Sequence, residues 1–271
     1  MPNLNRVATT AKVWRFCLSG LVLLAAGCSH SGDTEDRGRA FVPVSAPLPP
    51  AFLTGPMAVL LTNRAGYSAQ VEAQTGSLSE RERAVSGQLL CRGDKLFFAP
   101  AGSADSKKPA RNADFSFIWD VSGNSGYVLS EALQGYAPVS ASALVTNLLS
   151  APGQAAPEKI AGLACTPELA TAQLNNGSTA SFQVLRATAL QGLPVRLSSA
   201  TNAVPLTVTL SKIRLESPPA ELFAPPDGFT KYPSPAAMAD EIAVRQHNLR
   251  RKSVSPVQLP DGLQVTPPQR Y

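Results

Sequence analysis

Short alternating runs of apolar and polar residues, separated by turn-forming residues, fill the chain from residue 158 to residue 232. In residues 178–187, the apolar side chains of Ala180, Phe182 and Val184 recur at every second position, which places them on one face of a β-strand. The Asn-Asn-Gly-Ser sequence just before this run suits a tight hairpin, because asparagine and glycine tolerate positive φ angles. The stretch therefore predicts an antiparallel meander.

Similar runs predict further strands on both sides, at residues 57–62, 67–74, 84–91, 95–99, 115–121, 127–129, from 136, 159–164, 168–174, 193–199 and 205–215. Residues 140–149 are expected to form a short helix. A change of phase in the last run predicts a β-bulge near Ser211 and Lys212, and Pro194 favours an edge or the start of a strand. Since no helices alternate regularly with these strands, we expect a mainly β fold with a single curved antiparallel sheet.

A helix is predicted at residues 233–252. Ser234 and Pro235 form a favourable N-cap and first-turn pair, and a narrow stripe follows at Met238, Ile242, Arg245 and Leu249. We expect this helix to lie on the sheet. The remaining residues 253–271 contain four prolines and few apolar residues, which predicts a disordered tail.

The N-terminal 27 residues have the character of an export signal. They contain Arg6, Lys12 and Arg15 but no acidic residue, and the apolar run at residues 16–26 is too short to span a bilayer. Residues 28–55 are rich in serine, glycine, aspartate and proline without periodicity, so they are expected to form a flexible tether.

Removal of this signal changes the charge balance of the protein. The chain has 24 basic and 19 acidic residues, and loss of the three basic residues of the signal leaves 21 against 19. A nucleic-acid-binding surface needs a clustered basic face with stacking aromatic residues, and the sequence offers none. The cluster of Arg245, Arg250, Arg251 and Lys252 is instead expected to be a solvated helix end, where cations complement the helix dipole.

Cys28 follows the sequence Leu-Ala-Ala-Gly and resembles the lipidated cysteine of bacterial lipoprotein signals, although alanine stands where leucine is common. The resemblance implies that lipid on Cys28 anchors the mature protein to a bacterial membrane; an ordinary small-residue cleavage site is the alternative. Ser29 differs from the aspartate that resembles an inner-membrane retention signal, which favours the outer membrane, facing the periplasm.

Cys91 and Cys165 are the thiols that remain beyond Cys28, in a compartment that permits disulfides. They either form a disulfide or serve as small apolar core residues, because the sequence does not show how far apart their Cα atoms lie.

Phe115, Phe117 and Trp119 form the densest aromatic stripe in the chain. With Phe182 and Val184 they are candidates for the wall of an apolar ligand cavity, and packing in the core is the alternative interpretation. Arg-Gly-Asp at residues 92–94 is expected to be an ordinary hairpin turn, because it lies between two predicted strands.

No catalytic motif, metal-binding motif or phosphate-binding glycine loop is found in the sequence. The two histidines are His30, in the predicted tether, and His247, in a polar part of the predicted helix. We therefore expect a protein that is not an enzyme and needs no cofactor, although acidic residues that are distant in the sequence can still form a carboxylate pair after folding.

Four stretches resemble a family of unknown function related to LolA-type lipoprotein carriers. They are Gly162–Thr166, Leu193–Arg196, the turn Gly93–Lys95 and especially Ile213–Tyr232, in which Phe229 replaces the usual tyrosine. The resemblance covers residues 56–232. It implies a half-barrel, meaning a strongly curved and incomplete antiparallel barrel with one or two helices packed on it, whose concave apolar face accommodates acyl chains.

Two functions are compatible with this resemblance. The first is a lipid-anchored envelope protein that binds or hands over an apolar, acyl-chain ligand. The second is a scaffold or protein-interaction lipoprotein with no bound ligand. The functional arginine of the LolA family has no matching position in this sequence, so the resemblance assigns no transport residue.

Overall fold

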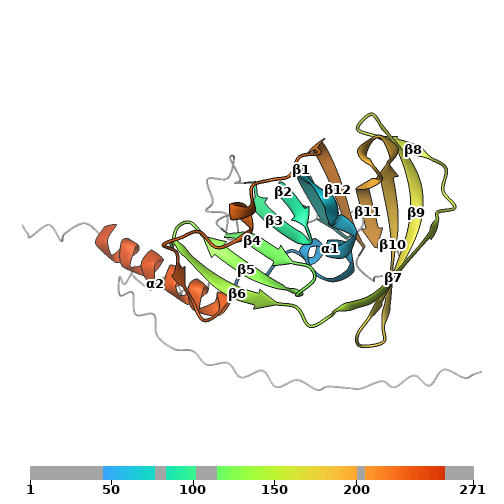
Figure 1. The fold of residues 1–271 in the computed structure, drawn as a ribbon. Helices are drawn as coiled ribbons and strands as arrows, with labels where there is room; N and C mark the ends of the chain where they lie inside the picture. The colour runs from blue at the N-terminus through green and yellow to red at the C-terminus, as the bar shows by residue number, and fades with distance from the viewer. Residues whose placement is uncertain (1–44, 77–83, 102–114, 200–204, 254–271) are drawn as a thin grey trace, which may run out of the picture. The chain divides into compact units, whose positions relative to one another are not determined.

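The computed structural model describes residues 45–76, 84–101, 115–199 and 205–253. These residues form one open, curled sheet of thirteen strands, with two α-helices and three short 3₁₀ helices (Figure 1). The predicted signal, Cys28, His30, most of the predicted tether and the C-terminal tail lie outside the described residues.

The first half of the sheet is a simple antiparallel meander. Its strands are β1 (Asn63–Thr75), β2 (Ala84–Gly93), β3 (Lys95–Pro100), β4 (Phe115–Asp120), β5 (Ser125–Ser130) and β6 (Gly135–Ser140). The turn between β2 and β3 contains Gly93 at φ 62°, a conformation that glycine adopts without strain. The expected hairpin at Arg-Gly-Asp is therefore confirmed.

The second half returns to the first through β12, which pairs with β1. Its strands are β7 (Val145–Pro152), β8 (Glu158–Ile160), β9 (Leu163–Leu174), β10 (Thr179–Ala187), β11 (Leu193–Ser199) and β12 (Leu206–Arg214), with η2 (Thr188–Leu190) before β11. The strand order is β13-β6-β5-β4-β3-β2-β1-β12-β11-β10-β9-β7, with β8 paired to β9. β7 thus lies at one end of the order and β6 next to the other end, and the sheet curls without closing (Figure 1).

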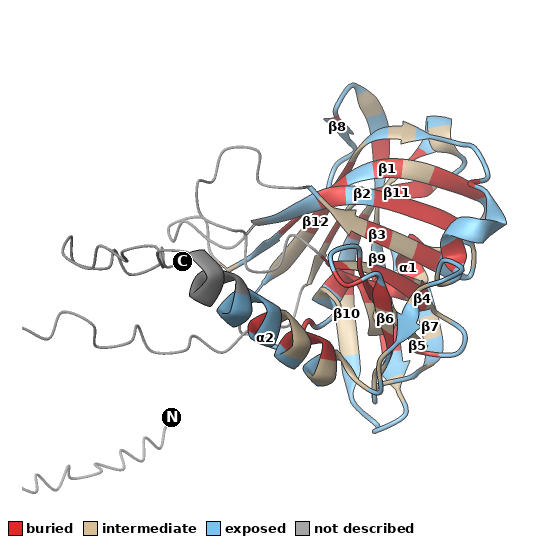
Figure 2. Ribbon diagram, turned by 90° about the vertical axis from the view of Figure 1, so that its left-hand side faces the viewer, coloured by how far each residue is buried: buried red, intermediate tan, exposed pale blue. Residues whose placement is uncertain are grey.

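One face of the sheet, which we call the concave face, carries the main core. Buried side chains alternate along the strands, as Tyr67, Ala69, Val71 and Ala73 do on β1 (Figure 2). Cross-strand neighbours share this face, since Ala69 lies opposite Leu89. The predicted fold, a mainly β protein with one curved antiparallel sheet, is confirmed.

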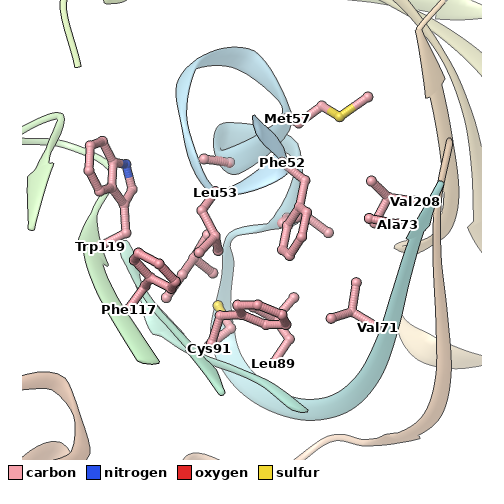
Figure 3. Close-up of a cluster of buried hydrophobic side chains, with 14 of the residues drawn as sticks. Phe52, Leu53, Met57, Val71, Ala73, Leu89, Cys91, Phe117, Trp119 and Val208 are labelled. Atoms are coloured by element: carbon pink, nitrogen blue, oxygen red, sulfur yellow. The ribbon is translucent and has the colours of Figure 1, made fainter. Parts of the chain in front are cut away.

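The concave face is covered by a segment that precedes the sheet, formed by η1 (Ala51–Leu53) and α1 (Gly55–Leu61). Figure 3 shows Phe52, Leu53 and Met57 of this segment among the side chains of the sheet, and all three are at most 3% exposed. The end of α1 is fixed by the hydroxyl of Tyr67, which donates a hydrogen bond of 2.7 Å to the carbonyl of Leu61. We call residues 51–61 the plug.

The plug corrects two predictions. Residues 57–62 were expected to form a strand, and the predicted tether extended to residue 55, yet residues 51–53 are already a 3₁₀ helix with two buried side chains. A short, continuous apolar run does not distinguish a buried strand from a buried helix. Pro56 in the first turn was the signal for a helix, because proline suits that position.

Two other predictions of secondary structure were wrong. Residues 140–149 were expected to be a helix, but residues 145–152 pair with β9 as an edge strand that is mostly exposed and therefore shows no regular apolar alternation. The run at 159–164 is divided by a turn, in which Ala161 (φ 49°) and Gly162 (φ 83°) both have the positive φ of a tight hairpin.

The predicted C-terminal helix is confirmed as α2 (Pro235–Ser253), and the hydroxyl oxygen of Ser234 accepts a hydrogen bond of 3.2 Å from the N–H of Ala237. Met238, Ala239 and Ala243 are buried, and the helix lies beside β6. Before it, the chain passes through η3 (Ala220–Phe223) and β13 (Thr230–Lys231), which pairs in parallel with β6.

Candidate functional site

All five residues that were candidates for a ligand cavity lie in the core on the concave face. Phe115, Phe117, Trp119, Phe182 and Val184 are each at most 5% exposed and belong to one hydrophobic cluster with the plug. They come from β4 and β10, which the curl of the sheet brings to the same cluster. The arrangement seen is the packing alternative, and none of the five lines either of the two pockets described below.

Trp119 has one unusual feature. Its side chain is fully buried, and among the described residues its indole Nε1 is the only buried side-chain polar atom without a hydrogen-bond partner. A buried N–H without a partner costs about 1–3 kcal/mol. In Figure 3 the indole lies beside the plug, so this N–H without a hydrogen-bond partner is near the plug.

A polar cluster lies at the β7 end of the sheet. The side chain of Arg186 binds both oxygens of Glu168, with Nε–Oε2 at 2.7 Å and Nη2–Oε1 at 3.2 Å. Its Nη1 donates to the carbonyl of Gly192 at 3.0 Å, and the hydroxyl of Ser150 donates to Oε1 of Glu168 at 2.6 Å. β7, β9 and β10 therefore each contribute one side chain to the cluster.

Strand register places this cluster on the concave face. Glu168 lies opposite Val184, and Ser150 lies opposite Ala170, and both of these partners belong to the core. Residues that face each other across two strands point to the same side of a sheet. Arg186 lies two positions beyond Val184 on β10 and shares its face.

A pocket of about 550 Å³ opens beside the cluster, and we call it the end pocket. The accessible surface of its lining is mostly apolar. The lining residues are Ser150, Ala151, Pro152, Thr166, Pro167, Glu168, Arg186, Thr188, Gln191 and Gly192. The turn after β10 forms part of its wall, because Gln191 and Gly192 have φ angles of 55° and 75° and reverse the chain there. Leu148, two positions before Ser150 on β7, and Leu190, next to Gln191, pack against the core, so the pocket borders the core of the concave face.

The carboxylate of Glu168 is charged at neutral pH. Burial disfavours its ionisation, but the hydrogen bonds from Arg186 and Ser150 outweigh this effect, and the pKa of Glu168 is lowered. The end pocket therefore contains one cation and one anion in contact, both about one quarter exposed, with no net formal charge between them.

The two thiols are not joined in the structure. Cys91 belongs to the main core cluster and Cys165 to a smaller one with Ile160, Ala187 and Val195, and both are free and buried. Burial raises the pKa of Cys91 to about 11 and raises the pKa of Cys165 as well. Each thiol thus occupies the place of a small core residue.

Sequence reasoning did not find the end pocket. Glu168 and Arg186 are 18 positions apart, and their contact depends on the exact register of β9 and β10. The only available signal was that both are charged residues in phase with the apolar side chains of their strands, at positions where alternation predicts an inward side chain.

Among the described residues, no group of three or more histidine, cysteine, aspartate or glutamate side chains is placed to hold a metal ion. Within the same ranges, no helix combines the length and the apolar character that crossing a bilayer requires. His247 is exposed on α2, as expected for a surface residue.

No family model and no curated protein matches this sequence. Among solved structures, the chain is similar to PNGF-II, at 10% identity over 66% of this chain and 33% of that one, with a TM-score of 0.36. It therefore spans about a third of PNGF-II.

Two further similar structures are of bacterial proteins. One is a LolA superfamily protein from Nitrosomonas europaea (11% identity, 62% and 93% coverage of the two chains, TM-score 0.34), and the other is the lipoprotein LppX from Mycobacterium tuberculosis (16%, 54% and 85%, 0.28). A member of the LolA superfamily is thus among the similar structures, and no family model supports the narrower branch of unknown function. These similarities are too distant to assign the chain to a family.

Proposed function

We propose that this protein holds an acyl-chain ligand in the end pocket, as a lipid-anchored and non-catalytic component of a bacterial cell envelope. The observation that carries the proposal is the pocket itself. The exposed surface of its lining is mostly apolar, its volume is about 550 Å³, and three of its lining side chains, Ser150, Glu168 and Arg186, lie on the same face of the sheet as the apolar core. This volume lies within the range of small-molecule sites, about 300–1,000 Å³.

The physical basis for an acyl chain is the burial of methylene groups, each of which contributes about 0.8 kcal/mol. A chain that enters beside Pro152 and Pro167 would extend toward Leu148 and Leu190, which border the core. The plug is an apolar segment on the same face, so the face accommodates apolar groups that are not part of a strand.

The ion pair at the wall of the pocket suits the polar end of such a ligand. Arg186 has five N–H donors, and the hydrogen bonds to Glu168 and Gly192 occupy three of them. The charges of Arg186 and Glu168 cancel, so the pocket favours an uncharged head that forms hydrogen bonds, such as an ester or a hydroxyl. A strongly anionic head would be repelled by Glu168.

The location in the envelope rests on the N-terminal sequence. The basic start, the apolar run at residues 16–26 and Cys28 support export and lipidation, and Ser29 supports the outer membrane, facing the periplasm. The alternative function, a scaffold that binds proteins and no lipid, predicts that the end pocket binds no acyl chain.

Filling the end pocket should abolish ligand binding. Thr166 is exposed, lies opposite Arg186 and lines the pocket, so a phenylalanine there would occupy the space of the ligand without disturbing the core. We expect Thr166→Phe to weaken the binding of a monoacylglycerol with a fluorescent acyl chain at least tenfold, measured by fluorescence titration.

The matched control is Gln183→Phe, which adds the same side chain at an exposed position on the opposite face of β10. It should bind like the unmodified protein. If neither the unmodified protein nor the control binds the probe, the scaffold alternative is favoured. Equal binding by the Thr166→Phe variant would place the ligand elsewhere.

A further inference from the structure

The opposite face of the sheet, which we call the convex face, carries a second pocket that the sequence did not predict. After β12, residues 215–222 cross this face over β1 and β2 (Figure 1), and we call them the strap. The strap is held by Glu216, which accepts a hydrogen bond from the hydroxyl of Ser68 at 2.9 Å, and by Arg92, which donates to the carbonyl of Pro218 at 2.6 Å.

Between the strap and the strands lies a groove of about 640 Å³. Its floor combines polar and apolar side chains: Gln70 on β1 lies directly opposite Gln88 on β2, and both are exposed, whereas the neighbouring Leu90 is almost fully buried. Its apolar wall is formed by the strap, at Pro218, Pro219 and Leu222. We call this space the convex groove.

A β-bulge turns two cations toward the convex groove. Ser68 pairs with Arg214, but Gln70 pairs with Ser211, so β12 has one residue more than β1 in this interval. This is the bulge predicted near Ser211 and Lys212, and it is confirmed. Bulges redirect side chains, and Lys212 and Arg214 both line the groove and are exposed, whereas Ile213 between them packs against the core.

Lys212 adopts a conformation that is unfavourable for its residue type. Its φ is 49°, in the left-handed region that glycine enters easily and that other L-residues rarely adopt. Glycine would therefore suit the bulge better than lysine on grounds of backbone conformation. Strained residues often occur at binding sites. A glycine would relieve the strain at residue 212 but would remove the charged amino group, so we infer that the amino group has a function.

The charge of the groove is positive. Among the described residues, neither Lys212 nor Arg214 forms an ion pair, and the carboxylate of Glu216 is engaged by Ser68. Two cations and one carboxylate leave the lining with a formal charge of +1. The next acidic side chain along this face of β1, Glu72, accepts a hydrogen bond from Gln74.

We propose that the convex groove binds an acidic glycan. Lys212 and Arg214 pair with its carboxylate, Gln70 and Gln88 form hydrogen bonds with its hydroxyl groups, and the prolines and leucine of the strap contact the apolar face of a sugar ring. The amides favour a hydroxyl-rich ligand over a bare anion, because each amide offers both donors and an acceptor. This site is independent of the acyl-chain proposal, since the two pockets share no lining residue.

The test uses the purified full-length protein and trigalacturonate, a short oligosaccharide of uronic acids, in isothermal titration calorimetry. We expect binding that weakens at least tenfold in Lys212→Gly and in Arg214→Gln. Lys212→Arg should retain binding. Lys159→Ala, at an exposed lysine on β8, is the control and should bind like the unmodified protein. The melting temperature of Lys212→Gly should not fall, because glycine relieves the positive φ.

Three comparisons distinguish the ligand class. Maltotriose, a neutral oligosaccharide of the same length, should bind at least tenfold more weakly than trigalacturonate, and inorganic phosphate should not compete at equal concentration. Equal binding of maltotriose, displacement by phosphate, or binding only to phosphatidylglycerol vesicles would overturn the proposal. Unchanged affinity in both Lys212→Gly and Arg214→Gln would do the same.

Discussion

Replacing Phe52 with alanine should lower the free energy of unfolding by about 3–5 kcal/mol, the usual cost of removing a buried aromatic side chain. Phe52 is 1% exposed, and its ring meets Phe98 of β3 edge-to-face, with centroids 5.1 Å apart and an interplanar angle of 86°. The effect would be large for a residue in a stretch whose sequence reads as a tether. It arises because the plug supplies the contacts that the open sheet does not make with itself.

Urea denaturation followed by circular dichroism measures this change. The matched control is Leu48→Ala, four residues earlier, where the side chain is 76% exposed and the expected change is within about 0.5 kcal/mol. Similar small effects for both variants would mean that residues 51–61 do not pack on the concave face.

Gly126→Ala should destabilise the protein by about 3 kcal/mol, at the upper end of the usual cost of overpacking. Gly126 lies on β5 opposite Trp119, and a β-carbon there would clash with the carbonyl oxygen of Ile118 and approach the Cα of Trp119 to 3.0 Å. Both are backbone atoms of β4, so the strands would have to separate to make room.

Gly123→Ala is the control for this substitution, because it lies in the turn between the same two strands. Its nearest contact for a new β-carbon is the hydroxyl of Ser125 at 3.3 Å, at the end of a side chain that can rotate. We expect its midpoint in urea to stay close to that of the unmodified protein. A smaller loss for Gly126→Ala than for Gly123→Ala would contradict the close packing of β4 on β5.

The strands were predictable because their signals are local. Period-two alternation and residues such as Gly93 and the Asn-Gly turn before β10 are read within a few positions, and the strands they predict are present. The bulge at Lys212 was also visible, as a change of phase within one strand. Each of these features is decided by neighbours in sequence.

The plug and the pockets were not predictable because distant residues decide them. α1 has seven residues, too few for a stable isolated helix, so its conformation depends on the sheet it covers. Glu168 and Arg186 meet through strand register, and the convex groove exists only because the strap crosses β1 and β2. The aromatic stripe at Phe115, Phe117 and Trp119 was visible in sequence, but the plug covers it.

The two faces of the sheet therefore differ in chemistry. The concave face is apolar, is covered by the plug and ends in a pocket with one neutralised ion pair, whereas the convex groove is polar and positive. A lipid anchor at Cys28 would hold both sites near a membrane.

The most direct measurement is photo-crosslinking with a monoacylglycerol that carries a diazirine in its acyl chain, followed by peptide mass spectrometry. We expect labels on the residues that line the end pocket, which are 150–152, 166–168, 186, 188, 191 and 192, and loss of these labels in Thr166→Phe. Labels on the convex face at Gln70, Gln88 or Leu90, or labels that persist unchanged in Thr166→Phe, would contradict the claim that the acyl chain binds on the concave face.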